Sequence, residues 1–347
     1  MTVEAPPKRP RGRPRKYPLP TELPVIQSDP NDCPVVQIIE KEYYLKETGL
    51  PLKLEPHQRR ILNAAFAVDE QGKQKYRTII YSAPKKSGKT EIGAGLTYAF
   101  LRKFGGQCYS IANDQEQAAS RMFQRVIETL EVMRQKHPRL YGKVIHPDFE
   151  EKIYKGRVIR FADDKQLNPG PHTLEYVPND FRGEAGGMPA LTMWDELWGY
   201  SSTGSERLWN EMQPVPNLPV SMRLVTTYAG FYGESHLLYS IYESLVDPDP
   251  HTDEPRGERV PGLEDLPCFH KGSYFCYWDH MARMPWHTPE FMDEARSDPS
   301  LNGREQEYER IWRNRWVTGL DAFIAMAVIN ERMAEGEEIG LVNHMAA

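Results

Sequence analysis

Two adjoining segments decide the fold, a short β-prone run and the loop that follows it. They are Arg77-Thr78-Ile79-Ile80-Tyr81-Ser82 and Ala83-Pro84-Lys85-Lys86-Ser87-Gly88-Lys89-Thr90. A helical pattern begins directly after the loop and continues to Phe104, where the pair Gly105-Gly106 stops it. The order strand, loop, helix is typical of one half of a parallel α/β unit.

The loop follows the pattern G-x-x-x-x-G-K-[ST], with Ala83 in place of the first glycine. Backbone N–H groups and the N-terminus of the following helix bind phosphate oxygens in loops of this kind. We expect Lys89 to neutralise the β- and γ-phosphates and the Thr90 hydroxyl to bind Mg²⁺. The alternative is a basic solvated turn. The predicted ATP-binding residues of the loop are Ala83, Pro84, Lys86, Ser87, Gly88, Lys89 and Thr90.

An apolar run about a hundred residues later, from Ala190 to Trp194, ends in Asp195 and Glu196. A buried strand that delivers two carboxylates at its end is what a Mg²⁺-dependent ATPase requires. Asp195 is predicted to support the metal and Glu196 to activate the attacking water. The alternative is that the acids only cap a helix.

Two further segments fit the same interpretation. The β-prone run that starts at Arg223 ends in Thr226 and Thr227, which we expect beside the γ-phosphate, where they would couple hydrolysis to movement; by itself this is only a strand end. Gln58 opens a helix expected over Arg59 to Val68, and its amide can accept from and donate to adenine. The alternative for Gln58 is a solvated side chain.

The remainder of the chain sets the domain organisation. Between Val35 and Tyr228, β-branched runs alternate with helical patterns, which predicts an α/β fold with a mostly parallel central sheet flanked by helices. We divide the 347 residues into a basic arm (1–34), an ATPase core (35–230), a lid or linker subdomain (231–320) and a tail or the start of a nuclease domain (321–347).

Charge is distributed unevenly. The net charge is −6, yet six bases precede Tyr17 against one acid, so the body beyond it carries 37 bases and 48 acids. The arm contains Arg11-Gly12-Arg13-Pro14, an AT-hook-like motif whose arginines fit the narrow minor groove of A·T-rich DNA. A solvated basic tail is the alternative, and it too would bind DNA phosphates. No apolar run is long enough to cross a membrane.

Taken together, these motifs resemble the large terminase subunit of tailed bacteriophages. The resemblance extends over about Leu50 to Ile324 and rests on Leu54-x-Pro56-x-Gln58, the phosphate loop, Trp194-Asp195-Glu196, Thr226-Thr227, Tyr277-Trp278-Asp279-His280, Arg283 to Glu290, Asn314-Arg315-Trp316-Val317 and Asp321-Ala322-Phe323-Ile324.

This resemblance implies a P-loop NTPase of the additional-strand, glutamate type that uses ATP and Mg²⁺. It implies a motor that moves double-stranded phage DNA into a prohead, as a homo-oligomeric ring on a portal protein. A small terminase subunit would guide it to DNA in the host cell cytoplasm.

The sequence departs from the family in two ways. Lys85 stands where many members carry arginine, and we expect it to contact the γ-phosphate. Family members continue into a nuclease domain after the Asp321–Ile324 segment, whereas only Ala325 to Ala347 follow here, so no nuclease activity is expected from this chain. Two other functions stay open: a helicase-like DNA translocase and a non-catalytic DNA-binding remnant.

Overall fold

The computed structural model describes residues 31–112, 121–146, 158–162, 166–178, 188–299, 301 and 305–319. The arm with Arg11, Gly12, Arg13 and Pro14 lies outside these residues, as does the tail 321–347.

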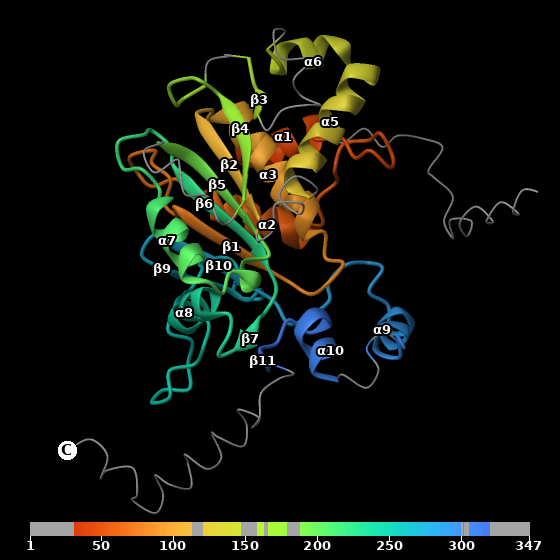
Figure 1. Cartoon of the computed structure of the whole chain (residues 1–347), viewed down its shortest axis with the longest axis vertical. Helices are drawn as coiled ribbons and strands as arrows, with labels where there is room; N and C mark the ends of the chain where they lie inside the picture. The colour runs from red at the N-terminus through yellow and green to blue at the C-terminus, as the bar shows by residue number, and fades with distance from the viewer. Residues whose placement is uncertain are drawn as a thin grey trace, which may run out of the picture.

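A nine-stranded sheet forms the centre of the molecule (Figure 1). Its spatial order is β3 (Val158–Arg160), β4 (Thr173–Pro178), β2 (Gln107–Ala112), β5 (Pro189–Asp195), β6 (Met222–Thr227), β1 (Thr78–Ser82), β10 (Tyr274–Trp278), β9 (Cys268–Lys271) and β8 (Glu258–Arg259). The six strands from β4 to β10 are parallel, and β3, β9 and β8 add antiparallel edges. The predicted mostly parallel sheet is confirmed.

Helices cover both faces of this sheet. One hydrophobic cluster joins α1 (Pro34–Glu42), α2 (Pro56–Ala65), α3 (Lys89–Lys103), α5 (Met122–Lys136) and α6 (Pro138–Val144) to one face. A second cluster joins η2 (Leu197–Gly199), α7 (Thr203–Glu211) and α8 (His236–Leu245) to the other.

The alternation of side chains along β1 explains how one strand serves both clusters. Ile79 and Tyr81 belong to the first cluster and Ile80 to the second, because successive side chains of a strand point to opposite faces. β1, β5 and β6 are buried along their whole length, as expected of parallel strands covered on both sides.

The helix expected over Arg59 to Val68 is shifted in the structure. α2 begins at Pro56, because Glu55 and Gln58 form a capping box and proline suits the first turn. It ends at Ala65, and Val68 instead pairs with Gln74 in an isolated β-bridge. The helical pattern that ends before Gly105-Gly106 is confirmed, since α3 ends at Lys103 and both glycines have positive φ.

The sheet continues past residue 230, where the expected lid or linker subdomain starts. β10, the aromatic strand, pairs in parallel with β1. Beyond it, α9 (Pro289–Arg296) and α10 (Glu305–Trp312) lie near one end of the sheet, with the small parallel pair β7 (Phe231–Tyr232) and β11 (Val317–Thr318) (Figure 1).

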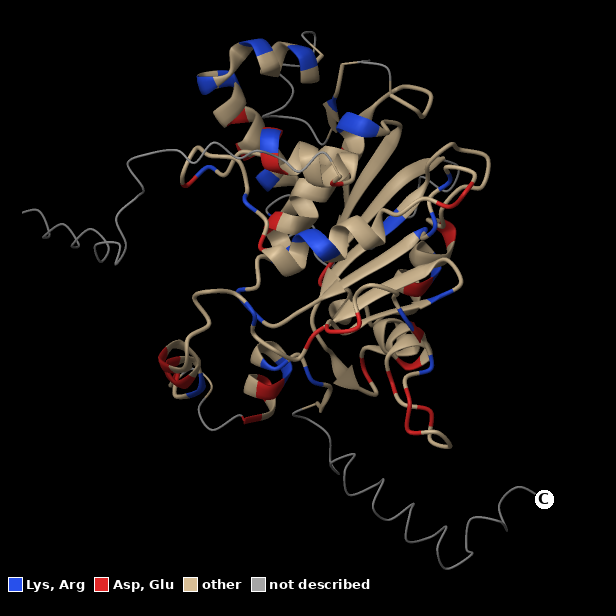
Figure 2. Cartoon of the chain, turned by 180° about the vertical axis from the view of Figure 1, so that it is seen from behind, with Lys and Arg blue, Asp and Glu red and all other residues tan. Residues whose placement is uncertain are grey.

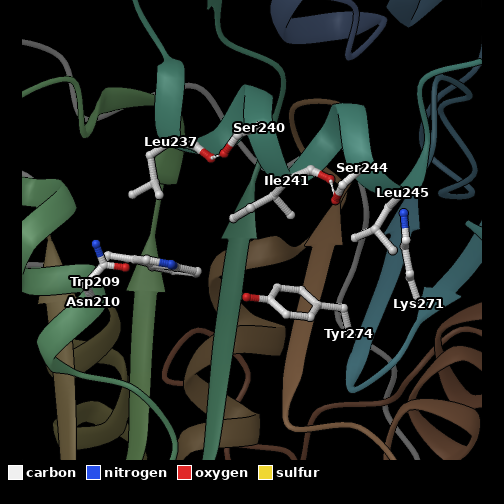
Figure 3. Close-up of a pocket in the computed structure, with 9 residues that line it drawn as sticks. All are labelled: Trp209, Asn210, Leu237, Ser240, Ile241, Ser244, Leu245, Lys271 and Tyr274. Atoms are coloured by element: carbon white, nitrogen blue, oxygen red, sulfur yellow. Dashed lines mark hydrogen bonds between the residues drawn. The ribbon is translucent and has the colours of Figure 1, made fainter. Parts of the chain in front are cut away.

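A groove of about 470 Å³ lies between α7 and α8 (Figure 3). Trp209, Ile241 and Tyr274 are among the residues that line it. Tyr274 is the first residue of β10 and pairs with Thr78, the first residue of β1, so this groove lies toward the amino ends of the parallel strands. Among the described residues, no helix is long and apolar enough to cross a membrane.

The fully buried Asn314 ties three chain segments together beyond the strand ends. Its Nδ2 donates to Ser82 Oγ (3.0 Å) and to the Asp279 carbonyl (2.9 Å), and its Oδ1 accepts from the Ala229 N–H (2.7 Å). Its backbone is left-handed, with φ of 52°. This one amide therefore holds the carboxyl ends of β1, β6 and β10 in a fixed relation.

We expect Asn314→Ala to lower the free energy of unfolding by about 3 kcal/mol, because three buried polar groups lose a partner and alanine is strained at this φ. Urea denaturation measures the change. Asn314→Gly removes the same contacts but tolerates the φ, so it should be less destabilising than alanine. A loss under about 0.5 kcal/mol for the alanine variant would contradict this role.

Candidate nucleotide-binding site

Three neighbouring parallel strands end at the same edge of the sheet. Asp195 on β5 is paired with Thr226 on β6, and Thr226 in turn is paired with Tyr81 on β1. One residue further, Ser82 pairs with Thr227. The phosphate loop leaves β1 at this level, so the loop and the acid pair lie at one edge, with the two threonines on the strand between them.

The loop has the backbone shape that a phosphate cradle needs. Lys86 and Gly88 have φ of 66° and 76°, and Gly88 is the N-cap of α3. Ala83 is buried, whereas the side chains of Lys85 and Lys86 are exposed. The first N–H groups of a helix have no acceptor within the helix, so α3 presents donors and its positive dipole end at the loop.

Lys89 turns its ammonium group toward the loop itself. Its Nζ donates to the carbonyls of Ala83 (2.8 Å) and Pro84 (3.0 Å) and lies 5.0 Å from the ring centre of Tyr228. Burial lowers the pKa of Lys89, while the charges of Glu196 and Asp195 act against that shift. The lysine and the acid pair therefore share one electrostatic environment.

Asp195 has one carboxylate oxygen without a partner. Oδ1 accepts from Thr226 Oγ1 at 2.9 Å, but the buried Oδ2 has no hydrogen-bond partner among the described residues. Burial raises the pKa of Asp195. An unpaired buried carboxylate oxygen is costly, and a cation bound to it would remove that cost. This oxygen is a hard donor of the kind that Mg²⁺ prefers. Thr90, which is partly exposed, lies at the start of α3.

Glu196 leaves the strand in a left-handed conformation, with φ of 56°. Its N–H donates to the Thr226 carbonyl at 2.7 Å, and its Oε2 accepts from the indole N–H of Trp198 at 2.8 Å. Burial raises the pKa of Glu196 to about 7. A partly buried carboxylate in this environment is a stronger base than a solvated one.

Thr227 also makes contacts at this edge. The Thr227 hydroxyl donates to the Tyr228 carbonyl (2.9 Å), and its oxygen accepts from the backbone N–H of Trp198 at 3.4 Å. Its carbonyl accepts from the Ala83 N–H at 3.4 Å. Thr227 thus contacts both the start of the phosphate loop and the segment that follows Glu196.

Gln58 lies against the phosphate loop and is 3% exposed, so it is not the solvated side chain of the alternative interpretation. Its Oε1 accepts from the Glu55 N–H at 3.0 Å, and its Nε2 donates to the Ser87 carbonyl at 3.3 Å and approaches Met284 Sδ at 3.5 Å. Both ends of the amide are therefore engaged in bracing the loop.

The segment after β10 and helix α10 also contact the loop. The Lys85 N–H donates to the Ile311 carbonyl at 2.6 Å, and Lys85 Nζ lies 5.6 Å from the ring centre of Trp312. Trp286 Nε1 donates to the Lys86 carbonyl at 3.0 Å, and His287 Nε2 lies 3.2 Å from the Lys85 carbonyl. Residues 200 or more positions away in sequence thus hold the tip of the loop.

Sequence patterns did not assign a role to Trp198, Arg310 or Asn314. Asn314 and its neighbours were part of the family resemblance, yet only the folded chain shows which strand ends its amide joins. For Trp198 the sequence offers one weak indication of a role, since an aromatic residue that can donate a hydrogen bond follows two positions after the acid pair. For Arg310 it offers none, because a single arginine on a charged helix is ordinarily solvated.

Comparison with solved structures identifies the fold. The crystal structure of the HK97 bacteriophage large terminase superposes with a TM-score of 0.56 at 17% identity, over 86% of this chain and 57% of that one. This chain shares the fold of the HK97 large terminase.

The chain spans little more than half the length of the HK97 terminase. Two further structures are similar at lower scores. The ATPase domain of the Thermus phage P74-26 large terminase gives a TM-score of 0.44 at 15% identity, over 76% of this chain and 94% of that domain. The Phi-28 gp11 DNA packaging motor gives 0.35 at 11% identity, over 69% and 65%. No protein-family model and no curated protein matches the sequence.

The contacts of Gln58 lead to a stability prediction for this terminase fold. Gln58→Glu keeps an oxygen for the Glu55 N–H but replaces the donor that faces the Ser87 carbonyl, so the free energy of unfolding should fall by about 1–3 kcal/mol. Gln58→Leu removes both contacts and should be at least as destabilising. Urea denaturation measures both variants, and unchanged midpoints would show that Gln58 does not brace the loop.

Proposed function

We propose that this protein is the ATP-hydrolysing large subunit of a phage terminase, a motor that moves double-stranded DNA into a prohead. The observation that carries the proposal is the shared sheet edge, where Lys89 of the phosphate loop lies in one electrostatic environment with Asp195 and Glu196. The unpaired oxygen of Asp195 supports a cation at the same place.

ATP binding would use the loop and the start of α3. The backbone N–H groups of residues 83–90 and the helix dipole attract the phosphates, and the Lys89 ammonium exchanges its two carbonyl contacts for phosphate oxygens. Lys85, whose exposed ammonium lies over Trp312, is proposed to contact the γ-phosphate. Gln58 is proposed to read adenine, an assignment that requires it to release a contact that it makes here.

Magnesium, when bound, would neutralise phosphate charge. Asp195 and Thr90 are the residues proposed to hold it. Glu196 is proposed to take the proton from the attacking water, for which its Oε1 remains available while Trp198 holds Oε2.

Thr226 and Thr227, between the loop and the acids, are proposed to couple hydrolysis to movement of the surrounding segments.

Double-stranded DNA is the proposed partner of the motor. Besides the arm, the end of α5 and helix α6 carry a basic cluster of exposed residues, Lys136, Arg139 and Lys143, and Figure 2 colours the Lys and Arg positions of these helices blue. No acidic residue occurs between Val132 and His146, so this cluster favours phosphate contacts on an otherwise acidic body. A homo-oligomeric ring on a portal protein, guided by a small terminase subunit in the host cell cytoplasm, completes the proposal.

We expect purified protein to hydrolyse ATP in a Mg²⁺-dependent and DNA-stimulated manner. Glu196→Gln should lower turnover by at least about 100-fold and leave ATP binding intact, because the general base is removed while the phosphate contacts remain. Glu211→Gln, on the exposed end of α7, is the matched control and should behave as wild type. A steady-state ATPase assay with fluorescent-nucleotide binding tests both.

Three outcomes would oppose this proposal. Full turnover by Glu196→Gln would remove Glu196 from the general-base role. A wild-type protein that binds DNA but hydrolyses no ATP would favour the non-catalytic DNA-binding remnant. ATP-dependent separation of DNA strands would favour the helicase-like translocase.

The AT-hook-like motif of the basic arm (1–34) leads to a separate prediction. Replacing both Arg11 and Arg13 by alanine should weaken binding to an A·T-rich duplex more than to a G·C-rich duplex, because only the former has the narrow, strongly negative minor groove. Fluorescence anisotropy at fixed salt measures both affinities. Equal losses on the two duplexes would indicate that the arm contacts only phosphates.

A further inference from the structure

The side chain of Trp198 donates a hydrogen bond to the Glu196 carboxylate. Trp198 follows two residues later, in the middle of the 3₁₀ helix η2, and its indole N–H lies 2.8 Å from Glu196 Oε2. Among the described residues this is the one hydrogen bond given to the carboxylate. Because Glu196 lies outside the strand in a left-handed conformation, the sheet itself does not orient its side chain.

Trp198 is itself held from several sides. Its ring stacks on Tyr228 with 5.8 Å between centroids and meets Phe231 edge-on at 6.0 Å. Its carbonyl accepts from Ser235 Oγ at 2.7 Å, and its N–H approaches Thr227 Oγ1. The indole is therefore a fixed donor rather than a mobile surface side chain.

The buried guanidinium of Arg310 on α10 completes this arrangement. It lies 4.4 Å from the ring centre of Trp198, 5.0 Å from Tyr228 and 4.5 Å from Phe231. Glu307 on the same helix pairs with it at 2.6 Å. A desolvated cation against three aromatic faces is a favourable contact that fixes the rings relative to α10.

Arg310 is not free to act on a ligand in this arrangement. It is 4% exposed, it is paired with Glu307, and its Nη1 approaches the Ala229 carbonyl at 3.5 Å. Its effect on the site must therefore pass through the rings that it contacts.

We propose that Trp198 is a positioning residue for Glu196, and that Arg310 acts through Trp198 to set the direction of the carboxylate. This inference rests on the proposed function, since it assigns the control of the general base in that site. The Glu196 carboxylate held through Oε2 leaves Oε1 to receive the proton from water.

One consequence is that helix α10 links the phosphate loop to Glu196. The same helix α10 supplies the Ile311 carbonyl to the Lys85 N–H and Arg310 to the Trp198 ring. A displacement of α10 would therefore alter the phosphate loop and the orientation of Glu196 together, so the two contacts make catalysis sensitive to the position of this helix.

The test is steady-state ATPase kinetics on Trp198→Phe, which keeps an aromatic ring against Tyr228 and Arg310 but deletes the N–H. We expect kcat to fall about tenfold, while KM for ATP stays within about twofold, because only the orientation of the base is lost. Trp209→Phe is the matched control: this buried tryptophan on α7 packs against Arg223 at 3.6 Å, and its replacement should leave kcat unchanged.

Two combined variants separate positioning from a general loss of structure. Arg310→Met should lower kcat in the same direction, and Trp198→Phe combined with Arg310→Met should be no worse than the stronger single variant, because both act on one carboxylate. In a Glu196→Gln background, Trp198→Phe should no longer change the residual rate. Thermal unfolding confirms that each variant is folded.

The outcomes are distinguishable. Wild-type kcat in Trp198→Phe, multiplicative losses in the double variant, or a raised KM with unchanged kcat would each overturn the positioning role while the proposed function stands. Absence of ATP turnover in the wild-type protein would overturn the proposed function and this inference with it.

Discussion

The parallel register of β5, β6 and β1 is the constraint on which the rest of the site depends. Asp195 lies opposite Thr226, and Thr226 lies opposite Tyr81, so three strands distant in sequence end at one level. Parallel strands present their carboxyl ends at a common edge of the sheet. No additional structural element is therefore needed to bring the phosphate loop and the acid pair together. A shift of β6 by one residue would turn its alternate side chains to the other face and remove Thr226 from Asp195.

Around this edge, polar groups are held by contacts from distant segments. The loop is braced by Gln58 on one side and by the Ile311 carbonyl on the other. Asn314 joins the ends of β1, β6 and β10. Near this edge, the non-glycine residues with left-handed backbone are Lys86 in the loop, Glu196 after β5 and Asn314. Strain stored at such positions is usual where a site must be preorganised.

Sequence patterns predicted most local elements near the site. The β-prone run before the loop and the helix that ends before Gly105 form as expected. Sequence patterns could not show that β10 inserts beside β1, since a five-residue strand carries no information about its neighbour. The burial of Gln58 was equally inaccessible, because it depends on Met284 and Ser87, which other segments bring to it.

The sequence by itself determined the phosphate loop, the carboxylate-bearing strand and the alternation that makes a parallel α/β fold, because these depend on the spacing of nearby residues. Tertiary structure alone decided that Asp195 keeps an unpaired oxygen, that Trp198 holds Glu196 and that Arg310 is enclosed by three rings. The physical reason is that burial and hydrogen-bond partners are properties of the packed chain. Side chains from distant segments, such as Arg310 and Trp198, acquire them only when the sheet and α10 come together.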